Sequence, residues 1–162
     1  MKAYKPMTHE IRNKVAMAMK NGLDISDIIQ EHDIAGENLA GAIIKKLNRP
    51  ASNLKNTNFT NAVIGQEGTI CNLTGSNLTG CNFTKVKFNG VIWFRRCNLQ
   101  NVNFFGAWMP YVELNGSDIS NIKICDAFIR VGTKNWYGTI GKPYRNEQLE
   151  SITEIQEQTL GR

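Results

Sequence analysis

Residues 71–90 read CNLTGSNLTGCNFTKVKFNG, and a large apolar residue returns about every five positions along this stretch. A small or β-branched residue stands two positions before each one, and Asn or Asp often lies between the two. A period of five fits neither the 3.6-residue period of a helix nor the 2.0-residue period of a strand. The same spacing runs over residues 52–129, where it places these residues: Leu54, Phe59, Ile64, Leu73, Leu78, Phe83, Phe88, Trp93, Leu99, Phe104, Met109, Leu114, Ile119, Ile124 and Ile129.

The units CNLTG, SNLTG, CNFTK, VKFNG, CNLQN and SDISN resemble the pentapeptide-repeat family, whose unit is a small residue, Asn or Asp, Leu or Phe, and two polar residues. The resemblance implies a mainly β fold, a right-handed quadrilateral β-helix with four repeats in each square coil. Because one coil cannot bury its own apolar centre, residues about twenty apart should stack inside the rod. We expect four ladders: Leu73, Trp93, Leu114; Leu78, Leu99, Ile119; Phe83, Phe104, Ile124; and Phe88, Met109, Ile129.

Two breaks interrupt the period of five. The spacing from Ile64 to Leu73 is nine residues, and the glycines within residues 65–68 predict a loop there. The spacing from Trp93 to Leu99 is six, which predicts one extra residue bulging out beside Arg95 and Arg96. This bulge is either a tolerated insertion or a basic projection that contacts a partner.

The repeat divides the chain into a helical head at residues 1–49, the β-helix at residues 50–130 and a tail at residues 131–162. Within the head, Thr8 can cap a first helix and Ser26 can cap a second that extends through Glu31. Leu39, Ala42, Ile43 and Leu47 would share the apolar side of a helix, so a third helix is expected over residues 37–47.

Residues 25–47 also resemble a helix-turn-helix. The departures are Ile29, where that motif prefers a small residue, and Asp33, where its tight turn prefers glycine. If the third helix entered a major groove, its early residues would face bases and its basic residues would meet phosphates. The alternative is a small helical cap, because a rod of this kind needs its terminal coil covered. The candidate DNA-contacting residues are Asn38, Lys45, Lys46 and Arg49.

The net charge of +5 comes from 19 Lys and Arg against 14 Asp and Glu. Family members that protect DNA gyrase from quinolones are viewed as mimics of duplex DNA, which requires rows of outward carboxylates. Residues 50–130 instead hold seven basic residues and four acidic ones. The charge therefore disfavours such mimicry, and the mild basic excess permits nucleic-acid affinity without demanding it.

Several outward positions of the repeat are apolar. Trp108 and Phe128 lie twenty residues apart, so they should stack on one face of the rod. A contiguous apolar patch marks an interface, and aromatic residues and Arg suit binding hot spots. Either a partner or the chain's own tail would cover this patch. The candidate partner-binding residues on this face, on the neighbouring face and at the bulge are Phe94, Arg95, Arg96, Phe105, Trp108, Tyr111 and Phe128.

The tail, residues 131–162, loses the period. Asn146 can cap a final helix in which Leu149, Ile152 and Ile155 form a narrow apolar stripe. A helix of about fifteen residues is marginal alone, so it should dock on the Trp108 face, cap the rod or pair two copies into a homodimer.

No pattern of catalytic or metal-binding residues stands out, so we expect no cofactor, no metal and no enzymatic activity. His9 and His32 both lie in the head, and three of the four cysteines fall on inward positions. No apolar run is long enough to span a membrane and no secretory signal is evident, so a cytoplasmic protein without membrane contact is expected. The leading hypothesis is a protein of phage or mobile-element origin that inhibits or shields a nucleic-acid-processing enzyme or a host defence complex. A DNA-binding regulator and a structural assembly component are the alternatives.

Overall fold

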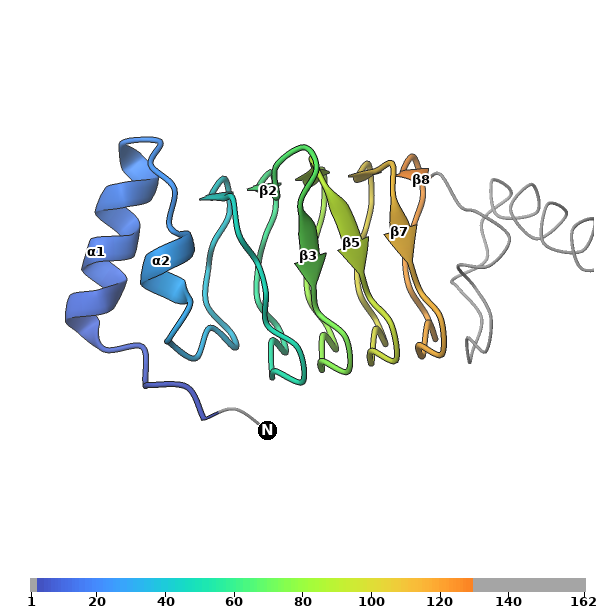
Figure 1. The fold of residues 1–162 in the computed structure, drawn as a ribbon, viewed down its shortest axis with the longest axis horizontal. Coiled ribbons are helices and arrows are strands. Elements are labelled where there is room, and N and C mark those ends of the chain that lie inside the picture. Colours follow the sequence, from blue (N-terminus) through green and yellow to red (C-terminus); the bar gives the residue numbers. More distant parts are fainter. Residues whose placement is uncertain (1–2, 130–162) are drawn as a thin grey trace, which may run out of the picture.

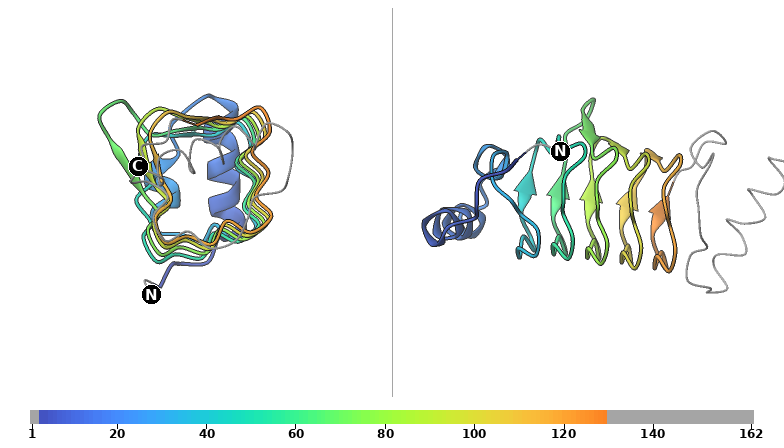
Figure 2. Two further views of the ribbon diagram at one scale, coloured as in Figure 1. Left: turned by 90° about the vertical axis from the view of Figure 1, so that its right-hand side faces the viewer. Right: turned by 90° about the horizontal axis from the view of Figure 1, so that it is seen from below.

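The computed structural model describes residues 3–129, which form two short helices followed by a four-sided β-helix (Figure 1). The mainly β fold expected from the repeat is confirmed. Viewed along the rod, successive coils superimpose on one square outline (Figure 2). The last predicted segment, the tail at residues 131–162 with its helix, lies outside the described residues.

Short parallel strands build two sides of the square. One side is a five-stranded sheet of β1 (Ile43–Ile44), β2 (Val63–Ile64), β4 (Lys87–Phe88), β6 (Trp108–Met109) and β8 (Phe128–Ile129). The next side is a three-stranded sheet of β3 (Ile70–Asn72), β5 (Val91–Trp93) and β7 (Val112–Glu113). Isolated parallel bridges join the coils on the other two sides, through Asn53, Asn77, Asn98 and Asp118 and through Asn38, Asn58, Asn82, Asn103 and Lys123.

The five-residue unit forms one side of the square because its Asn side chain and its corner residue turn the chain. In a typical unit, the Oδ1 atom of Asn77 accepts the backbone N–H of Thr79 at 3.0 Å. The following corner residue, Gly80, has a φ of 70°, in the left-handed region. Asn occupies the same corner at Asn101, with a φ of 59°, because its short polar side chain tolerates this conformation better than most.

Three of the four expected ladders are confirmed. The bridges align Leu78 with Leu99 and Ile119, and Phe83 with Phe104 and Ile124, while the strand register aligns Phe88 with Met109 and Ile129. Aromatic rings stack inside the second of these ladders: the Phe83 ring lies 5.0 Å from Phe59 and 5.2 Å from Phe104, and both ring pairs are nearly parallel. The interior is therefore filled with side chains.

The ladder through Trp93 is wrong by one residue. In the register of β3 with β5, Cys71 pairs with Ile92 and Asn72 with Trp93, so Phe94 stacks between Leu73 and Leu114. Ile92 and Phe94 are buried, and Trp93 points outward. The extra residue consequently lies near Gly90, before β5, and not beside Arg95 and Arg96.

The predicted loop between Ile64 and Leu73 is present, and it projects from the square outline between β2 and β3 (green in Figure 2). Its end returns to the coil at Gly90: the backbone N–H of Val91 donates to the carbonyl of Thr69 at 2.9 Å. A Cβ atom at Gly90 would lie only 2.5 Å from that same carbonyl oxygen. The loop and the extra residue are thus packed against each other.

The β-helix begins before residue 50, and the expected third helix over residues 37–47 is wrong. Leu39, Ala42 and Ile44 instead form the first coil, whose strand β1 pairs with β2. The five-residue spacing of inward residues continues from Leu54 back to Arg49. Arg49 is buried at the inward position that the next coil fills with Leu73. This buried guanidinium donates to the carbonyl oxygens of Ile29 and His32, at 2.7 Å each.

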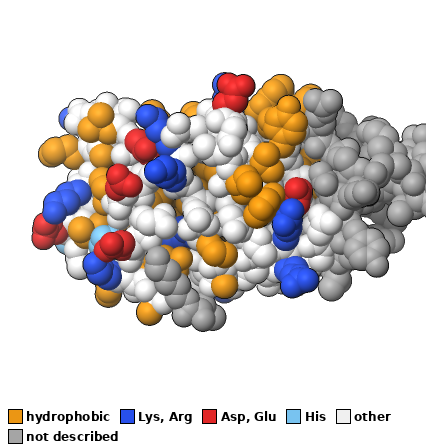
Figure 3. All heavy atoms as spheres, viewed as in Figure 1, with side chains coloured by type: hydrophobic (Ala, Val, Ile, Leu, Met, Phe, Trp, Pro, Cys, Tyr) orange, Lys and Arg blue, Asp and Glu red, His pale blue; other side chains and the backbone are white. Residues whose placement is uncertain are grey.

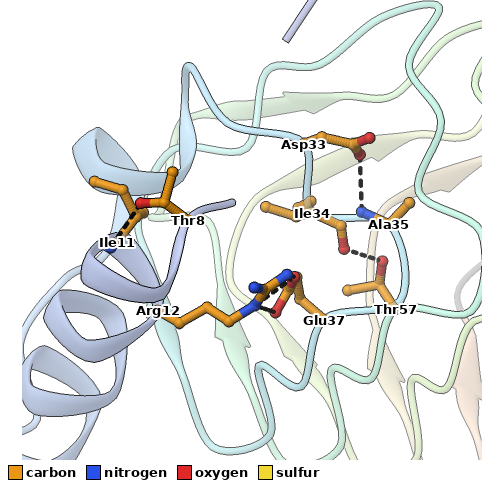
Figure 4. Close-up of polar contacts among 8 residues, drawn as sticks. All are labelled: Thr8, Ile11, Arg12, Asp33, Ile34, Ala35, Glu37 and Thr57. Atoms are coloured by element: carbon orange, nitrogen blue, oxygen red, sulfur yellow. Dashed lines mark hydrogen bonds and ion pairs between the residues drawn. The ribbon is translucent and has the colours of Figure 1, made fainter. Parts of the chain in front are cut away.

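The two remaining helices, α1 (His9–Lys20) and α2 (Ser26–Ile29), lie over the first coil. Thr8 caps α1 as expected, since its Oγ1 accepts the backbone N–H of Ile11 at 3.3 Å. Arg12 on α1 forms a two-pronged ion pair with Glu37 of the coil (Figure 4). Figure 4 also shows Thr57 donating to the carbonyl of Ile34, which joins the first coil to the second.

The helix-turn-helix prediction is therefore wrong. The second helix is a single turn that ends at Ile29, short of the predicted Glu31, and the segment that should be the recognition helix is a β-helix coil. The physical reason is that the inward positions of a coil recur at alternating spacings of two and three. Leu39, Ala42 and Leu47 satisfy both that rule and the rule for one helix face.

Candidate functional site

The most distinctive surface of the rod is the outer face of the five-stranded sheet. Its outward positions run from β1 to β8 as Ile43, Val63, Lys87, Trp108 and Phe128. Trp108 and Phe128 are 44% and 46% exposed, and their rings stack with centroids 4.1 Å apart and planes 14° apart. The expected stacking of these two side chains is thus present, and it presents a large, rigid aromatic surface to the solvent.

Two further aromatic side chains flank this stack at the corners of the square. Phe105 is 39% exposed at one corner and Tyr111 is 54% exposed at the other. We call Phe105, Trp108, Tyr111 and Phe128 the aromatic face. The apolar surface continues around the Tyr111 corner, because the register of the three-stranded sheet aligns Tyr111 with Val91 and with the exposed Ile70.

The neighbouring side adds one more outward aromatic side chain, Trp93, which the sequence pattern placed inside the rod. Trp93 is outward on β5, and the guanidinium of Arg95 lies 4.0 Å from its ring centroid. Arg95 also forms an ion pair with Glu113 on β7. Figure 3 shows hydrophobic side chains gathered over β5 and at the edge near β8. The contact of Arg95 with the Trp93 ring and its ion pair with Glu113 hold both side chains in place beside the aromatic face.

Two other expected partner-binding residues, Phe94 and Arg96, do not lie where the sequence placed them. Phe94 is fully buried and belongs to the core, so its assignment to the surface is wrong. Arg96 is exposed, but it is an ordinary corner residue with a φ of 53°, and not part of a bulge. Sequence reasoning missed Trp93 because Ile92, Trp93 and Phe94 are three large apolar residues in a row, and only the hydrogen-bond register decides which face inward.

Basic side chains lie on one side of the aromatic face, toward the first coil. Lys87 is exposed on the same sheet, in register with Trp108, and the backbone N–H of Lys85 donates to the carbonyl of Phe105. Lys46 occupies the corner position that Tyr111 occupies three coils later. Two carboxylates, Glu67 on the loop and Asp126 at the Phe105 corner, also lie at the edges. Lysines dominate the charge of this surface.

The structure separates the residues proposed to bind DNA. Arg49 is 0% exposed, its guanidinium lies 4.0 Å from the Tyr4 ring, and burial lowers its pKa. Asn38 belongs to the Asn column, where its Oδ1 accepts from Asn58 Nδ2 at 3.0 Å. Lys45 and Lys46 are exposed, but on a coil. These four residues do not form one DNA-reading surface.

The interior thiols are held in their neutral form. Cys81 donates to the carbonyl of Leu54 and Cys97 to that of Leu73, and both are buried. Burial raises the pKa of the Cys81 thiol to about 12 and that of Cys97 to about 11. Within residues 3–129, no three His, Cys, Asp or Glu side chains gather in a way that could hold a metal ion. None of the helices in this range is long and apolar enough to cross a bilayer.

Comparison with known proteins identifies the repeat. Residues 71–92 match the family model described as Pentapeptide repeats (8 copies). Among solved structures, the pentapeptide repeat protein Rfr23 from the cyanobacterium Cyanothece 51142 is 17% identical, with 67% of this chain and 90% of that chain covered and a TM-score of 0.27. QnrB1, a plasmid-mediated fluoroquinolone resistance protein, is 15% identical, with 79% and 72% covered and a TM-score of 0.27.

A third solved structure, a pentapeptide repeat protein from the thylakoid lumen of Arabidopsis thaliana, is 16% identical over 79% of this chain and 86% of that chain, with a TM-score of 0.24. No curated protein matches the chain in sequence. The family assignment therefore rests on the matched model, on the five-residue units themselves and on the square coil that they form.

Proposed function

We propose that this chain, whose residues 71–92 match the pentapeptide-repeat model, is a non-enzymatic protein that binds another protein through the aromatic face. The observation that carries this proposal is the exposed, mutually stacked pair Trp108 and Phe128. Stacked rings lose little side-chain freedom when a partner binds them, so their burial contributes to affinity at low entropic cost. Trp, Tyr and Arg, the residue types enriched at binding hot spots, are all present at this surface.

The charge beside the aromatic face supports a partner of acidic character. Lys85 and Lys87 lie in the coil before the aromatic face and Lys46 lies on the first coil. These three lysines outnumber the carboxylates Glu67 and Asp126 at the edges, and a basic excess favours a partner with the opposite sign. We infer a protein surface with an apolar depression and carboxylates around it. Outward Asn side chains cover much of the other two sides, and they make hydrogen bonds within the rod, so those sides offer less to a partner.

In its more specific form, the proposal is that the partner is a nucleic-acid-processing enzyme or a host defence complex, which this protein inhibits or shields. A basic rod would be repelled from the positively charged groove in which such an enzyme holds nucleic acid. The contact would therefore lie on an acidic surface of the partner, and inhibition would result from steric blocking or from locking one conformation.

Affinity capture with matched variants tests the proposal. The wild-type chain, the double variant Trp108→Ala with Phe128→Ala, and the control Leu23→Ala would each be immobilised and exposed to lysate of the native host. Leu23 is an exposed apolar residue next to α1, far from the aromatic face. We expect one protein to be retained by wild type and control and lost from the double variant. Retention of the same proteins by all three chains would contradict the proposal.

A further inference from the structure

The sequence of the chain itself contains a segment with the acidic and apolar residues that the aromatic face calls for. Residues 146–158 read NEQLESITEIQEQ, with four glutamates and no lysine or arginine. The stripe of Leu149, Ile152 and Ile155 supplies apolar side chains at helical spacing. We propose that this segment, residues 146–158, folds back as a helix onto the aromatic face of its own chain and competes there with the partner.

The position at which the described structure ends favours this occupant. The last described residue, Ile129, follows Phe128 directly and lies in β8. The segment that follows therefore starts at the aromatic face itself. Sixteen residues, 130–145, connect β8 to residue 146, and such a connection can extend over about 50 Å. The connection is long enough for the helix to return along any part of the sheet.

The length of the segment matches the height of the sheet. Thirteen helical residues span about 20 Å at a rise of 1.5 Å per residue. The five strands from β1 to β8 are separated by four intervals of about 4.8 Å, so the sheet is about 19 Å tall. A helix laid along the rod axis would place its apolar stripe over Phe128 and Trp108, cross Lys87 on the next strand, and reach the half-buried Val63 and Ile43. The apolar stem of Lys87 can lie against the stripe while its ammonium group extends past the helix into solvent.

The charges favour the same arrangement. On a helical projection, the glutamates of residues 146–158 lie on the side opposite the apolar stripe, so they would face the solvent when the stripe is docked. The glutamates would then attract Lys46, Lys85 and Lys87 without forming direct ion pairs. Such attraction acts over distances near the Debye length, which is about 8 Å at physiological ionic strength. Glu67 and Asp126 at the edges oppose this attraction in part.

The regulatory consequence rests on the proposed function, because competition matters only if a partner uses the aromatic face. The docking itself does not depend on a partner, and it can be measured in the isolated full chain. The two ideas therefore fail separately: loss of docking with retained partner binding removes only this inference.

Photo-crosslinking locates the segment. In the full chain, a benzophenone amino acid would replace Ile152, and the linked peptides would be identified by mass spectrometry in a mixture of isotopically light and heavy protein. We expect links within one chain to the peptide that contains Phe105, Trp108 and Tyr111. Links between light and heavy chains would show that a second copy supplies the segment, and links elsewhere on the rod would show another docking site. Either outcome overturns the inference.

Reaction of the native Cys125 thiol with a small thiol reagent supplies an independent measurement. Cys125 is half-buried at the corner next to Phe105, so a docked helix would shield it. We expect Ile152→Asp to speed this reaction about tenfold, and the control Gln158→Asp, on the other side of the helix, to change it less than about twofold. Cys81, buried in the core, should stay unreactive in both variants, which shows that the coil remains folded. Equal rates in both variants would contradict the inference.

Discussion

Arg49 shows how one residue can change the apparent start of a repeat. Its side chain occupies a position that Leu73, Phe94 and Leu114 fill in later coils, yet its guanidinium replaces the missing apolar contact with two hydrogen bonds and the Tyr4 ring. These bonds satisfy carbonyls at the end of α2, where a helix leaves acceptors unpaired. Arg49 therefore joins the helical cap to the first coil.

Arg49→Met should destabilise the fold strongly. Methionine replaces the apolar stem of Arg49 but not its guanidinium group. The carbonyls of Ile29 and His32 therefore lose their donor, which costs about 2–6 kcal/mol in the free energy of unfolding. Urea denaturation measures this change. The control Lys46→Met, at an exposed corner, should shift the free energy of unfolding by less than about 0.5 kcal/mol. An equally small effect of Arg49→Met would refute the role given to the guanidinium.

The buried thiols predict that stability falls at alkaline pH. In the unfolded chain Cys81 and Cys97 ionise near their ordinary pKa of 9, whereas in the folded chain they stay protonated to a pKa of about 12 and about 11. The unfolded state therefore binds fewer protons above pH 9, so the stability present below that pH is lost as the pH rises toward 11. Urea titrations at several pH values should show a shallower loss for Cys81→Ala than for wild type. Parallel curves would argue against this linkage.

At the scale of the element, the β-helix coil depends on what fills its interior and on what turns its corners. Phe59, Phe83 and Phe104 form a continuous stack across three coils. The corner residues of successive units share the left-handed conformation, whether they are Gly, Asn or a charged residue. Stacking and turning together give the coil its rigidity, on which the aromatic face depends.

Phe83→Ala should cost about 3–5 kcal/mol, because a ring is removed from the centre of the stack and its neighbours can relax only in part. The matched control is Phe105→Ala, which removes an aromatic ring from the surface and should cost less than about 0.5 kcal/mol. Calorimetric or chemical unfolding compares the two. Similar costs would mean that the two rings are not placed as described.

Gly41 distinguishes a coil from a helix over residues 37–47. Its φ is 76°, and an added Cβ would meet no atom within 4 Å, so only the backbone conformation opposes substitution. Gly41→Ala should lower the free energy of unfolding by about 1 kcal/mol or more, and Gly41→Asn should be tolerated better. In a helix, Ala would instead raise stability by about 1 kcal/mol. A stabilising Gly41→Ala variant would restore the helical interpretation.

The repeat made most of the rod predictable, and the failures have physical causes. The period of five predicted the ladders through Leu99, Phe104 and Met109 because large apolar residues recur there at an unbroken spacing of five. It failed at Trp93, where three adjacent large residues leave the register to the backbone hydrogen bonds. It also failed before residue 50, where a buried Arg hides the repeat. The exposed stack of Trp108 and Phe128 was predictable because a spacing of twenty residues places both on one side.

At the scale of the molecule, the four sides of the rod differ in chemistry. Two sides carry Asn columns bonded within the rod. Of the other two, one carries Trp108 and Phe128 with Lys87 on the neighbouring strand, and the other carries Trp93 beside Arg95, with Tyr111 at the corner between them. A rigid rod with binding residues on adjacent sides can contact one partner around a corner. This division of the surface leads from the repeat to the proposed function.

The most direct test of the account is the dissociation constant of the captured partner for the wild-type chain, Trp108→Ala and Leu23→Ala, measured by calorimetry at two salt concentrations. Loss of a central hot-spot residue should weaken binding about thirtyfold or more, while loss of the ring stack, about 1 kcal/mol, lowers the melting temperature by only a few degrees. Leu23→Ala should bind like wild type, and higher salt should weaken binding because the lysines contribute to it. Equal dissociation constants for wild type and Trp108→Ala would contradict the claim that the aromatic face is the binding surface.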